Sequence, residues 1–283
     1  MITINSVSGG KTSAYIAANY PADYNVFALV RTDDKKCMFP DAKLRQIVSD
    51  KIGKDFIGTL EDDMIIYTIL DLEQYIGKDI NWVSGLCFDE VIKTKGGWLP
   101  NKLHRYCSQW LKLIPIFEWW HKTLNEPVEM RIGFRANEMR RAKAMQEKTN
   151  KNGLLEIKHT ISKHKNGNNK WQIWEWQKPV FPLIKDAIFK DKIENYWQDK
   201  KVRFAYMNNC VACFHRNAIL LKHMSNKHPN KFNWFIKQEE GRKPKDTWKE
   251  VGNLRYKDIL KHKQQTELNF NDFNDCDSGY CGL

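Results

Sequence analysis

Apolar runs typical of buried strands alternate with amphipathic helical segments through the first 150 residues of this chain. Parallel strands need helical crossovers between them. The alternation therefore predicts an α/β domain with a mainly parallel, twisted sheet flanked by helices. We expect strands at 2–7, 23–34, 79–85 and 128–138, the last running into a helix, and helices at 11–19, 39–53, 62–77, 107–124 and 138–148.

The alternation ends near residue 150, where the sequence becomes rich in Lys and aromatic residues. Two strand-like segments flank Asn166-Gly167, a dipeptide typical of tight turns, so a β-hairpin is expected there. Its Trp171, Trp174 and Trp176 could stack on single-stranded bases, but we interpret them first as core residues. We predict an α/β domain at 1–150, a hairpin insert with a helical, cysteine-bearing region at 151–262, and a mobile tail at 263–283.

The charge balance is basic, because 46 Lys and Arg against 34 Asp and Glu give a formal net charge of +12. Such a balance suits a polyanionic partner, for example a nucleic acid or a nucleotide, and equally suits a plain solvated surface. We see no apolar run long enough for a membrane span and no basic, apolar leader. A cytoplasmic protein is therefore expected, whose 7 cysteines indicate metal or thiol chemistry rather than disulfides.

The first strand runs into a glycine turn with the sequence SGGKTS, which opens the first expected helix. Glycines allow backbone N–H groups to face a phosphate, and a helix N-terminus adds positive potential. A Walker A loop would need a glycine five positions before Gly10, where Asn5 stands instead. We therefore expect a phosphate-binding loop of another type, made of Ser8, Gly9, Gly10, Lys11, Thr12 and Ser13, with a plain strand-to-helix glycine turn as the alternative.

The SGGKTS turn resembles the S-G-G-x-D-S loop of the PP-loop ATP pyrophosphatase superfamily, with Thr12 where many members carry Asp. The segments RTDDKKCMFPD and IGFRANEMRRA are similar to segments of its phosphoadenosine phosphosulfate (PAPS) reductase branch. LPNKLHRYCSQWLKLIPIF resembles a segment of PAPS reductase-like proteins, many of them from phages and mobile elements. The matched segments span roughly residues 4–215.

This resemblance implies an adenine nucleotide alpha hydrolase-like fold that binds ATP or PAPS, with Mg²⁺ at the phosphates. The two acids of RTDDKK follow the second strand, at the edge where open α/β sheets bind ligands. Arginine suits a phosphate or sulfate because its fork donates two parallel hydrogen bonds. The implied nucleotide contacts beyond the loop are Asp33, Asp34, Gly133, Arg135, Arg140 and Arg141, and the implied catalytic residues are Lys11, Asp33, Arg135 and Cys281.

Cys210 and Cys213 form a CxxC pair, whose two thiolates can grip one metal ion or cluster. Several relatives of the PAPS reductases use an upstream cysteine and a later CxxC to hold an iron–sulfur cluster. The resemblance therefore implies a cluster on Cys107, Cys210 and Cys213, with a fourth ligand from Cys276, Cys281 or a substrate. A zinc site of Cys210, Cys213, Cys276 and Cys281 remains open, and so do plain reduced thiols.

Three functions are compatible with these residues. In the first, ATP is cut between its α and β phosphates, and a tRNA or DNA acceptor is adenylated and then receives sulfur from a thiol or a donor protein. In the second, PAPS or adenosine phosphosulfate is reduced to sulfite, with Cys281 of the terminal YCGL as nucleophile. The third is a nucleotide- or nucleic-acid-binding module that keeps the fold without catalysis.

Overall fold

The computed structural model describes residues 1–243, 246–248 and 255–262, so the expected tail at 263–283 lies outside the described residues. The strands are β1 (Thr3–Val7), β2 (Tyr24–Ala28), β3 (Arg31–Thr32), β4 (Gly58–Thr59), β5 (Asn81–Val83), β6 (Val128–Arg131), β7 (Leu155–Lys163) and β8 (Asn169–Val180). The helices are α1 (Lys11–Asn19), α2 (Ala42–Ile52), α3 (Met64–Ile76), α4 (Phe88–Thr94), α5 (Tyr106–Ser108), α6 (Ile114–Thr123), α7 (Met139–Gln146), α8 (Pro182–Lys185), α9 (Lys190–Trp197), α10 (Ala218–Lys227), α11 (Pro229–Glu239) and α12 (Tyr256–Ile259).

The main sheet has the strand order β5-β2-β1-β6-β8-β7 within the described residues. Neighbouring strands from β5 to β8 run parallel, and the edge strand β7 pairs with β8 in antiparallel register. The predicted α/β class with a mainly parallel sheet is therefore confirmed. The change near residue 150 does not mark a separate sheet, because β8 pairs with β6 and extends the main one.

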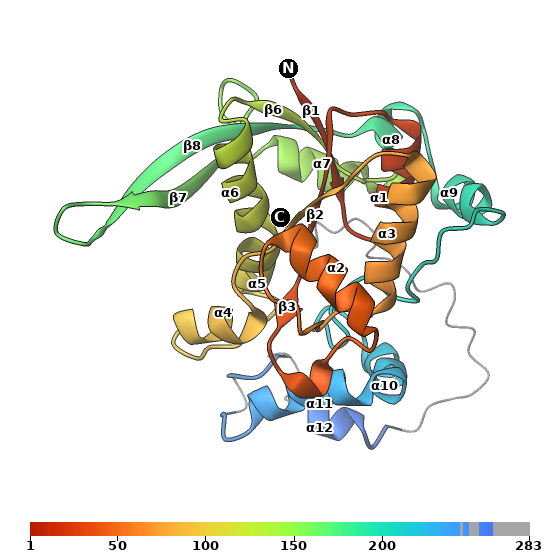
Figure 1. Ribbon diagram of the computed structural model, residues 1–283, viewed down its shortest axis with the longest axis vertical. Coiled ribbons are helices and arrows are strands. Elements are labelled where there is room, and N and C mark those ends of the chain that lie inside the picture. The colour runs from red at the N-terminus through yellow and green to blue at the C-terminus, as the bar shows by residue number, and fades with distance from the viewer. Residues whose placement is uncertain (244–245, 249–254, 263–283) are drawn as a thin grey trace.

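Helices cover both faces of this sheet, and the alternation of side chains along each strand explains why (Figure 1). On β2, Phe27 packs with residues of α1, α2, α3 and α9, whereas Val26 and Ala28 pack with residues of α6 and α7. Successive side chains of a strand point to opposite faces, so a strand buried on both sides reads as a continuous apolar run. Among the described residues, no helix is long and apolar enough to cross a membrane.

Local signals place several elements where we expected them. Asp41 caps α2 by accepting hydrogen bonds from the backbone N–H groups of Lys43 and Leu44, and Gly53 ends it in a left-handed conformation. The expected strand at 23–34 is wrong at its end, because β2 stops at Ala28 and β3 pairs with β4 in a separate small sheet. The expected helix at 107–124 is divided into α5, a π-helical segment and α6, and Pro115 occupies the first turn of α6, where proline fits.

The expected hairpin is formed by β7 and β8 and projects from the body as an arm (Figure 1). Gly167 at its turn has a positive φ of 83°, which explains the Asn-Gly sequence there. The core interpretation of the tryptophans is right for Trp176, which is 1% exposed, and wrong for Trp171, which is 54% exposed. Trp174 lies between these extremes and packs partly buried against the core under α6.

A second body of packed side chains lies past the carboxyl ends of the parallel strands. It joins α4, α10, α11 and α12, below the sheet in Figure 1. Its centre is aromatic: Phe88, Phe232, Trp234, Phe235, Trp248 and Tyr256 are all buried there. The predicted helical, cysteine-bearing C-terminal region is thus packed against the edge where α/β sheets bind their ligands.

Candidate functional site

The SGGKTS turn connects β1 to α1 at the carboxyl edge of the sheet. The backbone N–H of Ser8 donates to Ser13 Oγ at 3.1 Å, the two hydroxyl oxygens lie 3.0 Å apart, and Ser13 Oγ donates to the carbonyl of Gly10 at 3.1 Å. Gly9 has a φ of +78°, and a Cβ placed on it would lie 2.7 Å from Cγ2 of Ile65. The turn is therefore braced by its own serines and accepts only glycine at its tightest position.

Helix α9 packs over this turn. Lys11 forms an ion pair with Glu194 of α9, and the indole N–H of Trp197 donates to the Lys11 carbonyl at 2.9 Å. Thr12 is buried beside Gly133, where a Cβ would lie 3.4 Å from its methyl carbon. The predicted loop residues and Gly133 are thus brought together, and the charge of Lys11 is engaged by α9.

The two acids expected at the nucleotide lie elsewhere on the same edge. Asp33 is exposed, and its carboxylate lies 3.4 Å from the guanidinium of Arg31, which also donates to Ser84 at 3.0 Å. Asp34 accepts a hydrogen bond from the backbone N–H of Lys36 and caps a short 3₁₀ turn. These contacts tie both carboxylates to β3 and the turn after it rather than to the SGGKTS loop.

Two of the three expected arginines contact one carboxylate, that of Glu138. Arg135 is buried and donates through Nε to Glu138 at 3.1 Å, and Arg141 forms an ion pair with the other oxygen of the same carboxylate. The guanidinium of Arg141 also lies over the ring of Phe134, 4.4 Å from its centroid. Arg140 is exposed on α7. Glu138 therefore neutralises part of this cluster, a feature that the sequence motif did not indicate.

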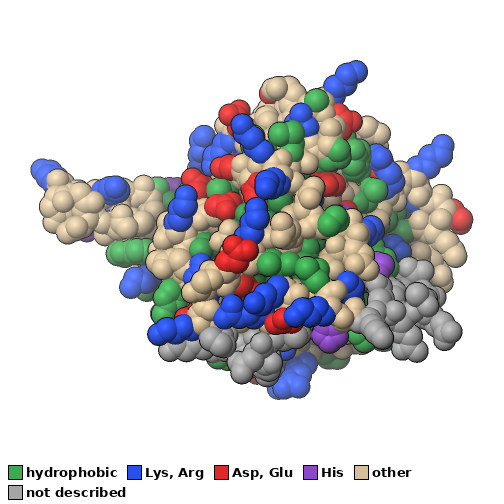
Figure 2. Space-filling model, turned by 90° about the horizontal axis from the view of Figure 1, so that it is seen from below, with side chains coloured by type: hydrophobic (Ala, Val, Ile, Leu, Met, Phe, Trp, Pro, Cys, Tyr) green, Lys and Arg blue, Asp and Glu red, His purple; other side chains and the backbone are tan. Residues whose placement is uncertain are grey.

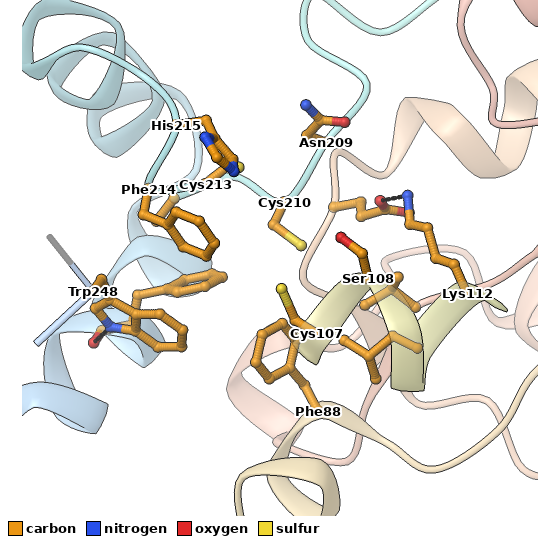
Figure 3. A pocket seen from close by; sticks show the side chains of 15 residues that line it. Phe88, Cys107, Ser108, Lys112, Asn209, Cys210, Cys213, Phe214, His215 and Trp248 are labelled. Carbon is orange, nitrogen blue, oxygen red and sulfur yellow. Dashed lines mark hydrogen bonds and ion pairs between the residues drawn. The ribbon is translucent and has the colours of Figure 1, made fainter. Parts of the chain in front are cut away.

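Cys107, Cys210 and Cys213 line one pocket of about 60 Å³, although they come from distant parts of the sequence (Figure 3). Cys107 lies on α5, and the CxxC pair lies on the loop before α10. Thiol side chains of Cys107 and Cys210 point toward one another across the pocket in Figure 3. An aromatic wall closes the pocket on the C-terminal side, with Phe88, Phe214, Phe235 and Trp248 among its residues.

Backbone contacts hold the CxxC turn against the sheet edge. The N–H of Val211 donates to the carbonyl of Leu60 at 2.8 Å, and the N–H of Cys213 donates to the carbonyl of Cys210 at 3.0 Å. The phenol of buried Tyr256 donates to the carbonyl of Ala212 at 2.8 Å. On the other side, α5 continues into a π-helical segment, Gln109–Leu113, a type of irregularity often found at functional sites.

Glu61 and Lys112 line the same pocket, and the sequence analysis missed both. Glu61 is only 1% exposed, and its Oε1 accepts from Lys112 Nζ at 2.9 Å. Its second oxygen, Oε2, is buried and accepts no hydrogen bond from the described residues. Burial alone would lower the pKa of Lys112, but Glu61 and nearby Cys210 outweigh it and raise that pKa. Lys112 is therefore protonated at neutral pH, and the second carboxylate oxygen of Glu61 is a buried polar atom without a partner among the described residues.

Burial has the largest effect on the pKa values of Cys107 and Cys210. It raises the pKa of Cys107 to about 12, with a further contribution from Cys213. It also raises the pKa of Cys210 well above its usual value, helped by Glu61 and Cys213. Without a bound cation these two thiols are thus protonated at neutral pH. A metal ion would reverse this, because it binds the thiolate form.

The donor types in the pocket fit a thiophilic metal, since Cys107, Cys210, Cys213 and the carboxylate residue Glu61 line one space. The part of the chain that the structure describes holds no group of three or more His, Cys, Asp or Glu side chains already arranged for a metal ion. Cys276 and Cys281, the other predicted ligands, lie outside the described residues, as does the predicted nucleophile role of Cys281.

The loop and the cysteine pocket adjoin the same short segment, Leu60–Ile65, which leads into α3. Ile65 packs against Gly9 of the loop, and Glu61 lines the cysteine pocket. Both features follow from the parallel topology, which gathers the carboxyl ends of neighbouring strands at one edge. The chain matches no family model, no curated protein and no solved structure in searches of each.

Proposed function

We propose that this protein is a PAPS reductase-like enzyme of the PP-loop type, which adenylates a nucleic-acid acceptor with ATP and transfers sulfur to it. One observation carries the proposal: the SGGKTS loop and the three-cysteine pocket flank the single segment Leu60–Ile65. A nucleotide at the loop and a sulfur in the pocket would then reach one acceptor from two sides. The resemblance of the loop to S-G-G-x-D-S supports ATP as the nucleotide.

The loop supplies electrostatic stabilisation of the leaving group. Its glycines and the start of α1 offer backbone N–H groups and positive potential to the β and γ phosphates. Lys11 adds a full charge once the phosphates compete with Glu194 for its ammonium. The loop carries Thr12 in place of an acid, so Mg²⁺ would be held mainly by the phosphates themselves, with waters completing its shell.

The reaction then proceeds in two redox-neutral steps. An oxygen on a carbon atom of the acceptor attacks the α phosphorus, the bond from that phosphorus to the bridging oxygen breaks, and pyrophosphate leaves. A sulfide equivalent from an external donor then attacks the activated carbon, and the acceptor oxygen departs with AMP. The sulfur enters at the oxidation level of sulfide, so no further reductant is needed.

Cys107, Cys210 and Cys213 would hold an iron–sulfur cluster or a zinc ion, with Glu61 Oε2 as a further donor. Such a group supplies a site where sulfide binds without free diffusion. The chain itself contributes the dry aromatic wall, which excludes water from the activated acceptor. Lys112 offsets the negative charge that three thiolates and Glu61 would otherwise concentrate in the pocket.

A binding module without catalysis is the second candidate function, and the surroundings of the loop favour it. Lys11 is paired with Glu194, and Thr12 is buried where a carboxylate would face the nucleotide. A module of this kind would bind ATP or PAPS and release neither pyrophosphate nor sulfite.

Product analysis under anaerobic conditions tests the proposal. The full chain is incubated with ATP, PAPS or adenosine phosphosulfate, each with sulfide and bulk tRNA or DNA. We expect AMP and pyrophosphate from ATP in equal amounts, with sulfur in the nucleic acid. Cys210→Ser should stop sulfur incorporation. Cys87→Ser is the matched control, because Cys87 is a buried thiol at the start of α4, where serine is a favourable cap.

Each other pattern of products rejects this assignment in a different way. Sulfite from PAPS or adenosine phosphosulfate would identify a sulfonucleotide reductase. Nucleotide binding without any product, even with sulfide and nucleic acid present, would identify the binding module. Equal loss of sulfur incorporation in Cys210→Ser and Cys87→Ser would show that the pocket has no special role.

A further inference from the structure

A large open cleft of about 750 Å³ lies beside the cysteine pocket, and neither the nucleotide nor the metal proposal uses it. One wall is the edge strand β7, and the other is formed by the segment from α4 to the π-helical turn. The two cavities meet at Ser108, which lines both. Whatever fills the cleft would therefore end next to Cys107.

The cleft is basic and aromatic. Lys95, Arg105 and Lys158 line it, against the single acid Glu156. Lys95 is held over the ring of Trp110, 4.8 Å from the centroid, a contact typical of an ammonium kept at an aromatic surface. Trp98 stands at the rim with 68% of its surface exposed. This combination suits a ligand with negative charges and flat rings.

The arm continues the chemistry of the cleft. Lys158, which lines the cleft, pairs with Ile173 on β8, and Thr160 pairs with Trp171, so these four side chains share one face. That face is open, with Trp171 and Ile173 exposed, while His159 and Trp174 on the opposite face pack toward Phe117 of α6. Large exposed apolar side chains on one continuous surface mark a binding face.

The charged side chains in the outer part of the arm are basic, without acidic ones among them. Residues 157–174 include four Lys and contain no Asp or Glu. Figure 2 shows Lys or Arg side chains at the tip of the projecting arm and hydrophobic side chains between the arm and the body. Lysines around the exposed ring of Trp171 fit phosphates and unstacked bases, whereas a paired duplex hides the faces of its bases.

We infer that the cleft and the open face of the arm bind single-stranded or locally unpaired nucleic acid, and that this strand is the acceptor delivered to the cysteine pocket. Bases would stack on Trp98 and Trp171, while Lys95, Arg105 and Lys158 would contact phosphates. The identity of this strand as the acceptor rests on the proposed function. Its binding does not, because neither nucleotide nor cysteine chemistry is needed for it.

Fluorescence anisotropy with labelled oligonucleotides of about 15 residues tests the inference on the full chain without nucleotide. Oligo-dT and oligo-U serve as separate probes, and a duplex of the same length serves as competitor. We expect both single strands to bind more tightly than the duplex. Trp171→Ala should weaken binding about ten-fold. Lys158→Glu should weaken it and flatten its dependence on salt.

The matched control is Lys192→Glu on α9, an exposed lysine on the opposite side of the molecule from the arm (Figure 1). It should bind as the parent does. Equal weakening by Lys192→Glu and Lys158→Glu, with no effect of Trp171→Ala, would reveal general charge attraction and overturn the inference. Undetectable binding of single strands would overturn it too, as would displacement of the probe by an acidic polypeptide such as polyglutamate at equal charge.

The two proposals fail in distinguishable ways. Cys210→Ser should retain full single-strand affinity, because its side chain lies in the neighbouring pocket. Trp171-dependent binding without any AMP from ATP would reject the proposed reaction and leave the binding surface standing. ATP-dependent sulfur transfer that is unchanged in Trp171→Ala and Lys158→Glu would reject the surface and leave the reaction standing.

Discussion

Gly9 meets two separate demands, and each forbids a side chain. Its φ of +78° costs a non-glycine residue about 1–2 kcal/mol, and a Cβ would lie 2.7 Å from Ile65 Cγ2. Overpacking of this kind costs about 1–3 kcal/mol more. We therefore predict that Gly9→Ala lowers the free energy of unfolding by about 2–4 kcal/mol in urea titrations and weakens nucleotide binding.

Gly53 provides the control for that substitution. It also has a positive φ, 64°, but nothing lies within 4 Å of the position that its Cβ would take. Gly53→Ala should therefore lose only the backbone cost of about 1–2 kcal/mol. An equal loss in the two variants would mean that Ile65 moves aside and that the loop is not tightly packed against α3.

At the scale of single residues, the sequence indicated residues that the local backbone conformation requires. It missed residues whose role depends on neighbours that are distant in the sequence. Gly9 could be identified because the strand-to-helix turn needs a positive φ at that position. Glu61 could not, since its importance comes from the loop that brings Cys210 beside it. Arg135 lies beyond the end of β6 at Arg131 and not within the expected strand at 128–138, and its engagement by Glu138 depends on a capping turn that the motif does not specify.

Helix α9 acts on the loop through one ion pair. Glu194 competes with any bound phosphate for Lys11, so its removal should free that charge. We predict that Glu194→Gln raises the affinity for ATP about two- to five-fold, a modest factor because both side chains are partly exposed. Titration calorimetry with ATP and PAPS measures this change.

Asp191→Asn is the matched control, since Asp191 is an exposed acid at the start of the same helix. It changes the net charge equally without touching Lys11. A similar gain in both variants would reflect long-range attraction of the nucleotide to a more basic protein. A loss in Glu194→Gln alone would instead mean that the ion pair holds the loop in its binding shape.

Among the helices and strands, those bounded by capping or turn residues could be predicted. Strand ends that depend on pairing with a distant strand could not. The ends of α2 follow from Asp41 and Gly53, and the hairpin follows from Asn166-Gly167. The break between β2 and β3 has no comparable signal, because the apolar run at residues 26–30 continues past the end of β2 at Ala28. Its cause is tertiary: the chain leaves the sheet after Ala28 to pair with β4.

At the scale of the whole molecule, the fold brings thiols from distant parts of the sequence to one edge of the sheet. Burial there raises the pKa of two of them. In the metal-free protein, burial raises the pKa of Cys107 to about 12 and that of Cys210 above its usual value. In the unfolded chain both thiols titrate near pH 8.5, at about their ordinary pKa. Above about pH 8.5 the folded chain holds protons that the unfolded chain releases, so the free energy of unfolding falls as pH rises.

We predict that this decline reaches up to about 1.4 kcal/mol per pH unit for each of Cys107 and Cys210 between about pH 9 and 10, and that it fades below about pH 8. Urea titrations across this range measure it.

Saturation with Zn²⁺ or with ferrous iron and sulfide should remove the part of the slope that belongs to the pocket, since metal-bound sulfur is already deprotonated. Cys87→Ser should keep this metal effect, because Cys87 lies outside the pocket. In Cys107→Ser, by contrast, the effect should shrink. A pH profile that metal leaves unchanged would mean that these buried thiols hold no metal, and sulfur delivery would then have to come from reduced cysteines alone.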